Sequence, residues 1–294
     1  MTKPYRDFAD FLSEHFEGKV QKLAINAGLS CPNRDGTLGR GGCTYCVNSS
    51  FNPAYCRAES GVSAQIERGK EFFARKYPTM RYLAYFQAYT GTNAPVSRLM
   101  ELYSEALAAD GVVGLIIGTR PDCMPDRLLS ELRSLAAGGT FVMVEYGAES
   151  SHDATLQLIN RCHTWQCTCD AVRRTADAGI PVGLHLINGL PGEDEEMILR
   201  TVDALNMLPV DVVKFHQLQL LRGARLSEQV ARGELSVAEW SADEYVDLCC
   251  RIVHRLRPDI AIERFVSQSP DDLLISPRWG LKNYQFTDRL RARL

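Results

Sequence analysis

The sequence lacks a long hydrophobic run and a strong excess of charge. Its most apolar stretch, GVVGLIIG at residues 111–118, is far shorter than the roughly 20 residues of a membrane-spanning helix. Residues 1–16 mix charged and apolar side chains and lack the continuous apolar segment of a secretory signal. The formal net charge of −3 excludes a protein that holds nucleic acid by overall charge alone. These absences predict a cytoplasmic protein without membrane contact.

The sequence also lacks low-complexity segments and internal repeats beyond an alternation of strands and helices. With 294 residues, of which 45% are hydrophobic, it can bury a substantial core as one large domain. It has ten cysteines, but in a reducing compartment these do not indicate a disulfide framework. They direct attention to metal binding or catalysis instead.

Short apolar segments alternate with longer segments of helical spacing. The apolar segments are rich in β-branched side chains, which is typical of parallel strands covered by helices. This alternation predicts an α/β fold with a parallel sheet, either doubly wound or closed into a full or partial barrel. Both architectures place ligands at the carboxyl ends of the strands. The predicted strands lie at residues 20–26, 81–88, 112–117, 141–146, 180–187 and 211–218.

Three cysteines follow the first predicted strand, and their loop has no fourth. Cys31, Cys43 and Cys46 lie in CPNRDGTLGRGGCTYC, whereas a structural zinc site uses four protein ligands. Thiolates bind an iron–sulfur cube one per iron, so three cysteines leave one iron open. S-adenosylmethionine (SAM) can chelate that iron, and one electron then cleaves it into methionine and a 5′-deoxyadenosyl radical. Zinc completed by Cys56 or by a distant histidine, or three unrelated thiols, are the alternatives.

The rest of the cysteine loop suits a bound cluster. Its glycines let the backbone wrap closely and offer N–H groups to the sulfides, and Tyr45 can pack against an adenine. A second cluster is not expected at Cys162, Cys167 and Cys169, because the last two point to different faces of a predicted helix.

Five motifs carry a family resemblance: INAGLSCPNRDGTLGRGGCTYC, RYLAYFQAYTGT, VGLIIGTRPDCMPD, INRCHT and INGLPGE. In this order they resemble the YhcC/YtqA-type radical SAM proteins, a family related to the radical SAM domain of elongator protein three. The resemblance implies a partial (β/α)6 barrel with a helix-rich C-terminal extension, and a SAM-bound 4Fe–4S cluster on Cys31, Cys43 and Cys46. We place an N-terminal helix at residues 1–19, the core barrel at 20–226 and the extension at 227–294.

The resemblance also implies which residues contact SAM. Gln87 and Tyr89 end the second strand, where this superfamily places contacts to the SAM amino group. Arg161 matches an arginine that reaches the SAM carboxylate. His185 is expected near the adenosine, and Gly189 in a tight turn whose backbone passes close to the adenine.

The chain departs from its relatives at two positions near this site. It has Cys162 where typical relatives have glycine, and GAESS where many have a GLQT-like segment. Glu149 therefore brings a charge near the expected ribose. Because a carboxylate can accept hydrogen bonds from both ribose hydroxyls, we expect Glu149 to bind SAM and the change to affect the choice of substrate.

Further polar residues lie at strand ends where a substrate would bind. Arg120 ends the third strand, and its guanidinium suits a phosphate or a carboxylate. Lys214 and His216 alternate on the sixth strand and share a face, so they are candidates for substrate contact or proton donation. A buried structural pair is the alternative, and Glu145 on the fourth strand poses the same choice.

The resemblance implies an enzyme that modifies a wobble uridine of tRNA, with removal of a carboxymethyl group from its side chain as the leading reaction. A reductase such as flavodoxin or ferredoxin would supply the electron. The basic C-terminal residues Arg289, Arg291 and Arg293 are a candidate local contact to tRNA. One alternative is a radical SAM lyase or salvage enzyme for a free modified base. The other is a zinc-stabilised RNA-binding module without catalysis.

Overall fold

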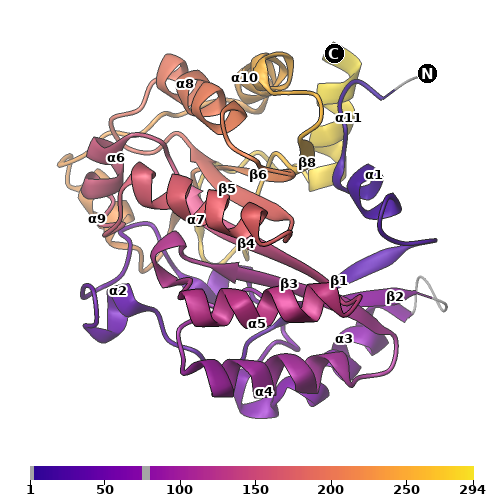
Figure 1. Ribbon diagram of the computed structural model, residues 1–294. Helices are drawn as coiled ribbons and strands as arrows, with labels where there is room; N and C mark the ends of the chain where they lie inside the picture. The colour runs from indigo at the N-terminus through magenta and orange to yellow at the C-terminus, as the bar shows by residue number, and fades with distance from the viewer. Residues whose placement is uncertain (1–2, 75–79) are drawn as a thin grey trace.

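Seven parallel strands form one sheet that curls into a half-barrel (Figure 1). The computed structural model describes residues 3–74 and 80–294. This seven-stranded sheet confirms the predicted partial barrel and has one strand more than the sequence pattern indicated. In sheet order the strands are β1 (Val20–Ile25), β2 (Arg81–Phe86), β3 (Val112–Thr119), β4 (Phe141–Glu149), β5 (Val182–Asn188), β6 (Val212–Gln217) and β8 (Ala261–Arg264).

The additional strand, β8, comes from the segment that we predicted as a helix-rich extension. It pairs in parallel with β6, with Val212 beside Ala261 and Lys214 beside Arg264. The C-terminal part of the chain therefore supplies one edge of the half-barrel itself.

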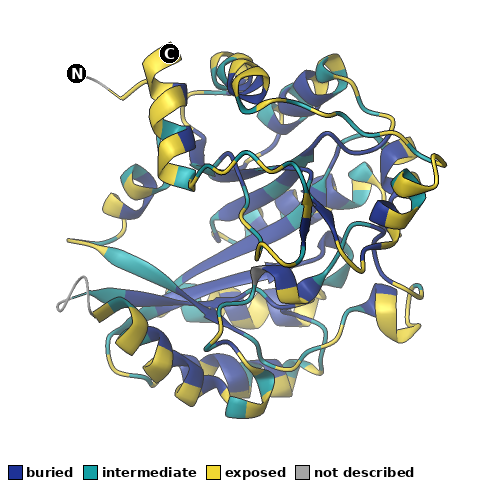
Figure 2. Ribbon diagram, turned by 180° about the vertical axis from the view of Figure 1, so that it is seen from behind, coloured by how far each residue is buried: buried dark blue, intermediate teal, exposed yellow. Residues whose placement is uncertain are grey.

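A layer of helices covers the outer face of the sheet, and their inward sides are buried while their outward sides are exposed (Figure 2). Apolar residues recur at helical spacing, as at Leu99, Leu102 and Ala106 of one of these helices. Polar caps fix several starts, such as Thr164 and Asp194, whose side chains accept backbone N–H groups. The helices are α3 (Val62–Ala74), α4 (Val96–Leu107), α5 (Asp126–Ala137), α7 (Trp165–Asp177), α8 (Glu195–Asn206) and α10 (Ala242–Arg255).

A short N-terminal helix, α1 (Phe8–Ser13), lies against the inner face of the sheet near the amino ends of the strands (Figure 1). Phe11 and Leu12 are buried there against inward-facing residues such as Leu83, Ile116 and Met143. This apolar contact fills the amino end of the half-barrel, so ligands can enter the interior from the carboxyl end.

Shorter elements carry the loops at the carboxyl end. They include α2 (Pro32–Asp35), α6 (Asp153–Leu158), α9 (Arg225–Ala231) and the 3-10 turns η1 (Asn48–Phe51), η2 (Ala58–Ser60) and η3 (Pro121–Cys123). Strands β7 (Leu220–Leu221) and β9 (Leu274–Ser276) form a small antiparallel pair. Across residues 3–74 and 80–294, no helix has the length and apolar character needed to span a bilayer.

The basic C-terminal helix, α11 (Asn283–Arg293), packs on α10 and lies away from the carboxyl ends of the strands (Figure 1). Its arginines face acidic residues of the same molecule: Arg291 pairs with Asp7 at 3.2 Å, and Arg293 with Asp243 at 2.9 Å. Arg289 also lies 3.8 Å from Asp243. The sequence pattern offered these arginines as a contact to tRNA, but the structure engages them in intramolecular ion pairs.

Candidate active site

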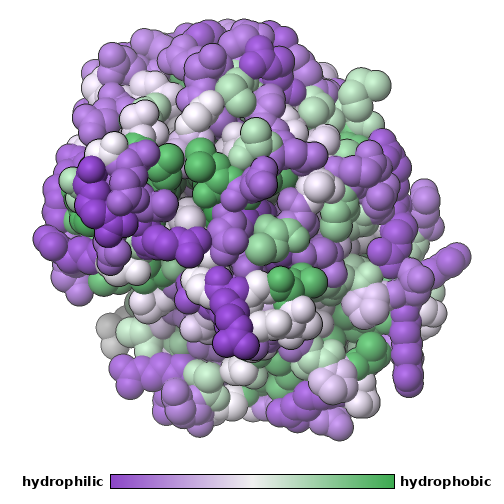
Figure 3. Space-filling model, turned by 90° about the vertical axis from the view of Figure 1, so that its left-hand side faces the viewer, coloured by the Kyte–Doolittle hydropathy of each residue, from purple (hydrophilic) through white to green (hydrophobic). Residues whose placement is uncertain are grey.

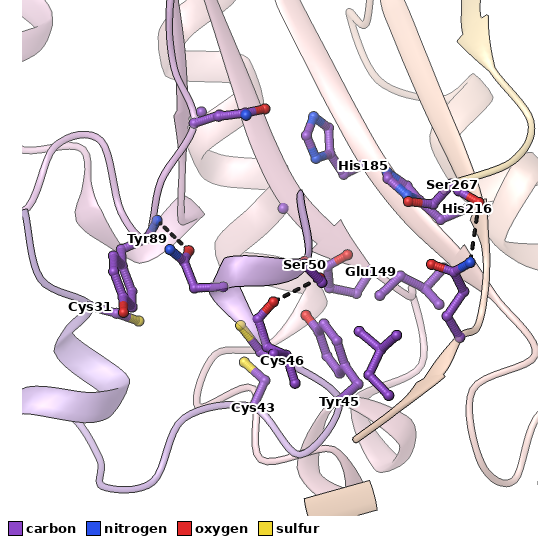
Figure 4. Close-up of a pocket in the computed structure, with 18 of the residues that line it drawn as sticks. Cys31, Cys43, Tyr45, Cys46, Ser50, Tyr89, Glu149, His185, His216 and Ser267 are labelled. Carbon is purple, nitrogen blue, oxygen red and sulfur yellow. Dashed lines mark hydrogen bonds between the residues drawn. The ribbon is translucent and has the colours of Figure 1, made fainter. Parts of the chain in front are cut away.

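A cavity of about 310 Å³ opens at the carboxyl ends of the strands. Figure 3 views the molecule from this side, where polar and apolar residues are interspersed. The cavity brings together residues from six of the seven strand ends and from the cysteine loop (Figure 4). Among the predicted site residues, those that line it are Cys31, Cys43, Tyr45, Cys46, Gln87, Tyr89, Arg120, Glu149, Arg161, His185 and His216.

The cysteine loop is shaped by local turns and anchored to a distant segment. Gly42 has a φ of +76°, and a β-carbon there would lie 2.8 Å from the Arg34 side chain, so glycine is needed for the turn. The Asn33 amide donates to the Asn160 carbonyl at 2.6 Å. The Asn160 amide in turn donates to the Gly42 carbonyl at 2.8 Å. These reciprocal bonds hold the loop against the end of α6.

The three thiols of the loop are free and face one cavity. Cys43 is buried, and its Sγ accepts hydrogen bonds from Arg161 at 3.5 Å and from the Asn33 amide at 3.6 Å. Burial, reinforced by the neighbouring Cys43, raises the pKa of the Cys46 thiol to about 11. Thiolate ligands therefore need a compensating positive charge, which a metal cluster supplies directly.

The donor set fits an iron–sulfur cluster better than a single ion. Within residues 3–74 and 80–294, no three His, Cys, Asp or Glu side chains converge closely enough to hold one metal ion. A cube binds each thiolate through a different iron, so its thiolates need not meet at one point. Cys56, the candidate fourth zinc ligand, does not line the cavity, and burial raises its pKa to about 12.

Strained backbone surrounds the cysteine loop. In the described part of the chain, the non-glycine residues with positive φ are Tyr89 (56°), Glu149 (68°), Asn160 (55°) and Cys162 (63°). Tyr89 and Glu149 line the cavity, while Cys162 contacts Asn33 of the loop at 3.1 Å. Such strain concentrates at ligand-binding sites. The positive φ of Cys162 is a conformation that glycine adopts without strain, which agrees with the glycine that the family resemblance implies here.

Arg161 joins the cysteine loop to the end of β4. Besides Cys43, its guanidinium donates to the Gly147 carbonyl and lies 3.5 Å from the Glu149 carboxylate. Its Nε is buried without a hydrogen-bond partner among the described residues. Arg161 and Glu149 thus place a cation and an anion side by side on the cavity wall, as a zwitterionic ligand requires.

Arg120 is largely occupied by the protein. Its Nε and Nη2 form a two-pronged ion pair with Asp122 at 2.8 and 2.7 Å, and Nη2 also donates to the Arg161 carbonyl at 2.8 Å. Only its buried Nη1 lacks a partner within the described chain. Nη1 is therefore the one nitrogen of Arg120 whose hydrogen-bonding capacity the described chain leaves unused.

The base of the cavity is a buried network of charges centred on Glu145. This carboxylate accepts hydrogen bonds from Tyr85 at 2.7 Å and Lys214 at 2.9 Å. Burial alone would raise the pKa of Glu145, but the ammonium groups of Lys214 and Lys22 outweigh it and hold the pKa well below its usual range. Lys214 itself does not line the cavity and lies beneath it.

Two histidines lie above this network. The Nε2 of His185 is 2.7 Å from Glu145, and the His185 ring is 5.8 Å from that of His216. Burial, followed by the nearby Arg264, lowers the pKa of His216 well below its usual value. Burial and the Lys214 charge also lower the pKa of His185. Both rings are therefore neutral near pH 7.

Gly189 lies outside the lining of this cavity. Its φ of +89° confirms a tight turn after β5, and a β-carbon there would lie 2.9 Å from the Trp240 ring. The close approach at this position is thus to a tryptophan of the C-terminal region. Its predicted role beside the adenine stays a prediction.

Several cavity residues were not predicted from the sequence. Arg34 is within the motif that was noticed and donates to the Cys46 carbonyl at 2.7 Å. Asn48 accepts the Tyr89 backbone N–H at 2.9 Å. Others come from the C-terminal part of the chain. They lie in two segments that the sequence marked, QLQLLRG at the end of the sixth strand and RLRPDIAIERFVSQSP as a continuation of the family resemblance, but they were assigned no role: Gln217, Gln219, Arg264, Ser267, Gln268 and Ser269.

Comparison with known proteins agrees with this geometry. Residues 31–205 match the Radical SAM superfamily, and residues 210–294 match the Radical_SAM C-terminal domain. The chain therefore belongs to the radical SAM superfamily, whose members bind a 4Fe–4S cluster and SAM. Among its relatives is the YtqA protein of Bacillus subtilis, 37% identical over 99% of this chain and 90% of YtqA.

Two further similarities are to an archaeal Elp3 structure and to a tRNA uridine(34) acetyltransferase. A structure of archaeal Methanocaldococcus infernus Elp3 superimposes with a TM-score of 0.67 at 18% identity, covering 93% of this chain and 64% of that one. A tRNA uridine(34) acetyltransferase of Methanocaldococcus jannaschii is 31% identical over 42% of this chain and 22% of its own length. The first similarity shows a shared fold.

Proposed function

We propose that this radical SAM enzyme modifies a wobble uridine of tRNA. The observation that carries the proposal is a cavity, in a half-barrel shared with Elp3, that is lined by three free thiols. The partial similarity to a tRNA uridine(34) acetyltransferase supports uridine 34 as the target. Removal of a carboxymethyl group from the uridine side chain is the reaction that we consider first.

The residues divide the work of such a reaction. When bound, the cluster and SAM would supply the radical chemistry, in which one electron from the cluster cleaves SAM to give a hydrogen-abstracting 5′-deoxyadenosyl radical. Cys31, Cys43 and Cys46 would hold the cluster. Arg161 and Glu149 would bind the charged and hydroxyl groups of SAM, since they lie side by side on the same wall.

The remaining cavity residues would complete the SAM site and face the substrate. Tyr45, Gln87, Tyr89 and His185 line the walls and would surround the nucleoside and methionine parts of SAM. His216 and one nitrogen of Arg120 would face the substrate. Lys214 would act indirectly, since it holds Glu145 and Tyr85 in place beneath the cavity.

A free modified base or other small molecule is the second candidate substrate. It is favoured by the net charge of −3 and by the ion pairs that engage Arg291 and Arg293, because both weaken the case for a broad tRNA-binding surface. In either case the electron donor would be a reductase such as flavodoxin or ferredoxin. We place the reaction in the cytoplasm, because free thiols persist in reducing compartments.

Anaerobic reconstitution tests these proposals. Purified enzyme with dithionite and SAM is incubated either with bulk tRNA from a deletion strain or with the same tRNA digested to nucleosides. Formation of 5′-deoxyadenosine and changes in the nucleosides are followed by mass spectrometry. A changed uridine derivative in intact tRNA alone supports the first proposal, and a change in the digest alone supports the second. If neither material is altered although SAM is cleaved, both are wrong.

A further inference from the structure

Four arginines line the cavity, and they differ in what their guanidinium groups contact. Arg34 donates to the Cys46 carbonyl at 2.7 Å. Arg120 is paired with Asp122. Arg161 lies beside Glu149 and donates to the Gly147 carbonyl. Arg264, at the end of β8, contacts no carboxylate or carbonyl oxygen among the described residues.

The neighbour of Arg264 is a histidine that cannot balance its charge. Nη2 of Arg264 lies 3.2 Å from Nε2 and 3.3 Å from Nδ1 of His216. The His216 ring is neutral, as its lowered pKa indicates, so the guanidinium keeps its full positive charge. Nε of Arg264 is buried and has no hydrogen-bond partner within residues 3–74 and 80–294. A buried unpaired donor is costly unless a ligand satisfies it.

The carboxylates at the base of the cavity are paired with other cations. Glu263, the preceding residue, pairs with Lys22 and lies 3.2 Å from Lys214. Glu145 accepts from Lys214 and Tyr85. Two lysines thus balance two glutamates at the base of the cavity, and the charge of Arg264 is left over.

Hydrogen bonds also fix the backbone segment that carries Arg264. Directly after it, the Ser267 backbone N–H donates to the Gln217 side chain at 2.7 Å, and the Gln217 amide donates back to the Ser267 carbonyl at 3.0 Å. The Tyr245 hydroxyl donates to the Phe265 carbonyl at 2.9 Å. These bonds fix the backbone after β8 beside the cavity, and the contact with the His216 ring orients the guanidinium.

We propose that Arg264 is the specificity-determining residue that binds an oxyanion of the substrate, with His216 beside it. The oxyanion is either a carboxylate on the modified base or a phosphate of the nucleotide, because a guanidinium fork suits both. This inference rests on the proposed function for the kind of substrate. The residue itself is chosen by its unbalanced charge in the cavity.

Binding of matched probes tests the role of Arg264. Isothermal titration calorimetry on reconstituted protein with SAM compares the binding affinities of 5-carboxymethyluridine, its neutral methyl ester and uridine 5′-monophosphate. The variants are Arg264→Gln and Arg264→Lys, with Arg222→Gln as control because Arg222 is exposed and outside the cavity lining. Iron content and SAM cleavage without substrate show whether each variant is intact.

We expect Arg264→Gln to weaken the binding of one anionic probe by about 10- to 100-fold, since it removes a hydrogen bond to a charged group. The affinity for the methyl ester should stay unchanged. The affinity of Arg264→Lys for the anionic probe should lie between those of the wild type and Arg264→Gln, and Arg222→Gln should match the wild type. Loss confined to the carboxylate or to the monophosphate identifies the oxyanion.

The proposal for Arg264 is overturned if Arg264→Gln lowers the affinity for the charged and neutral probes equally. It is also overturned if neither anion, at millimolar concentration, shows binding that depends on Arg264. These outcomes are independent of the tRNA experiment. Unaltered tRNA with Arg264-dependent binding of a free anion would reject only the tRNA proposal.

Discussion

The base and the upper wall of the cavity contain similar charged residues, but they differ in how completely those residues are paired. At the base, Glu145 and Glu263 face Lys22 and Lys214 in a closed network. On the wall, donor nitrogens of three arginines are buried without a partner in the described chain: Arg120 Nη1, Arg161 Nε and Arg264 Nε. The comparison separates a network whose charges are fully paired from arginines whose hydrogen-bonding capacity is not fully used.

The largest expected effect concerns the wall. Cys43→Ala should abolish the absorption band near 400 nm of the reconstituted protein and all SAM cleavage, because it removes the most buried of the three proposed ligands. Cys56→Ala is the matched control and should keep both, since this thiol does not line the cavity. Iron analysis and 5′-deoxyadenosine formation measure the outcome. Retention of the band in Cys43→Ala would contradict the cluster assignment.

The next effect concerns the base. Glu145→Gln leaves Lys22 and Lys214 with one carboxylate between them, and breaking a buried pair in this way costs about 3–5 kcal/mol. Urea unfolding of the cluster-free protein measures the free energy, with Glu59→Gln as an exposed control. A loss below about 1 kcal/mol would show that the network does not stabilise the fold.

A smaller effect depends on pH. Burial, Arg264, His185 and Lys214 depress the pKa of His216 in the folded protein, while Glu145 opposes them. The unfolded chain therefore binds a proton below about pH 6.5 that the folded protein excludes, so stability falls on acidification. His216→Gln should reduce the loss in unfolding free energy between pH 7 and pH 5 by up to about 2 kcal/mol.

The exposed His254 supplies the control for this pH effect. His254→Gln should keep the full pH dependence of the unfolding free energy. An unchanged pH dependence in His216→Gln would mean that His216 is protonated in the folded protein, and its charge would then add to that of Arg264.

The smallest effect lies outside the cavity. Replacing Arg289, Arg291 and Arg293 together by glutamine removes exposed ion pairs, each worth at most about 1 kcal/mol. We expect tRNA binding and SAM cleavage to be unchanged, in contrast to the expectation from the basic sequence pattern. A filter-binding assay at two salt concentrations measures this, and a clear loss of tRNA affinity would restore the terminal helix as a contact.

Local patterns predicted the parts of the fold in which neighbouring residues share a structural role. Six strands and the helices between them follow from apolar periodicity, and the cysteine loop is a contiguous motif whose thiols do face one cavity. Strand β8 was missed because it has only four residues and is stabilised by pairing with β6, far away in sequence.

Site residues were predictable only where a motif or a strand end marked them. His216 was found because it shares a strand face with Lys214, yet the sequence could not show that one lines the cavity and the other lies beneath it. Arg264 lies in RLRPDIAIERFVSQSP, into which the family resemblance continues, but the sequence did not single it out, because its importance depends on which distant carboxylates are already paired. For the same reason the turn at Gly189 was predictable, but its neighbour Trp240 was not.

The contribution of β8 to the sheet has a consequence for how such proteins diversify. The thiols and the residues proposed for SAM lie in the stretch that matches the superfamily, whereas His216, Arg264 and the serines after it lie in the stretch that matches the C-terminal domain. If these roles hold, the first portion of the chain supplies the radical chemistry with part of the substrate wall, and the second portion supplies the rest of that wall. Substitutions in residues 210–294 can therefore change the substrate wall while the cysteine loop and the proposed SAM site stay the same.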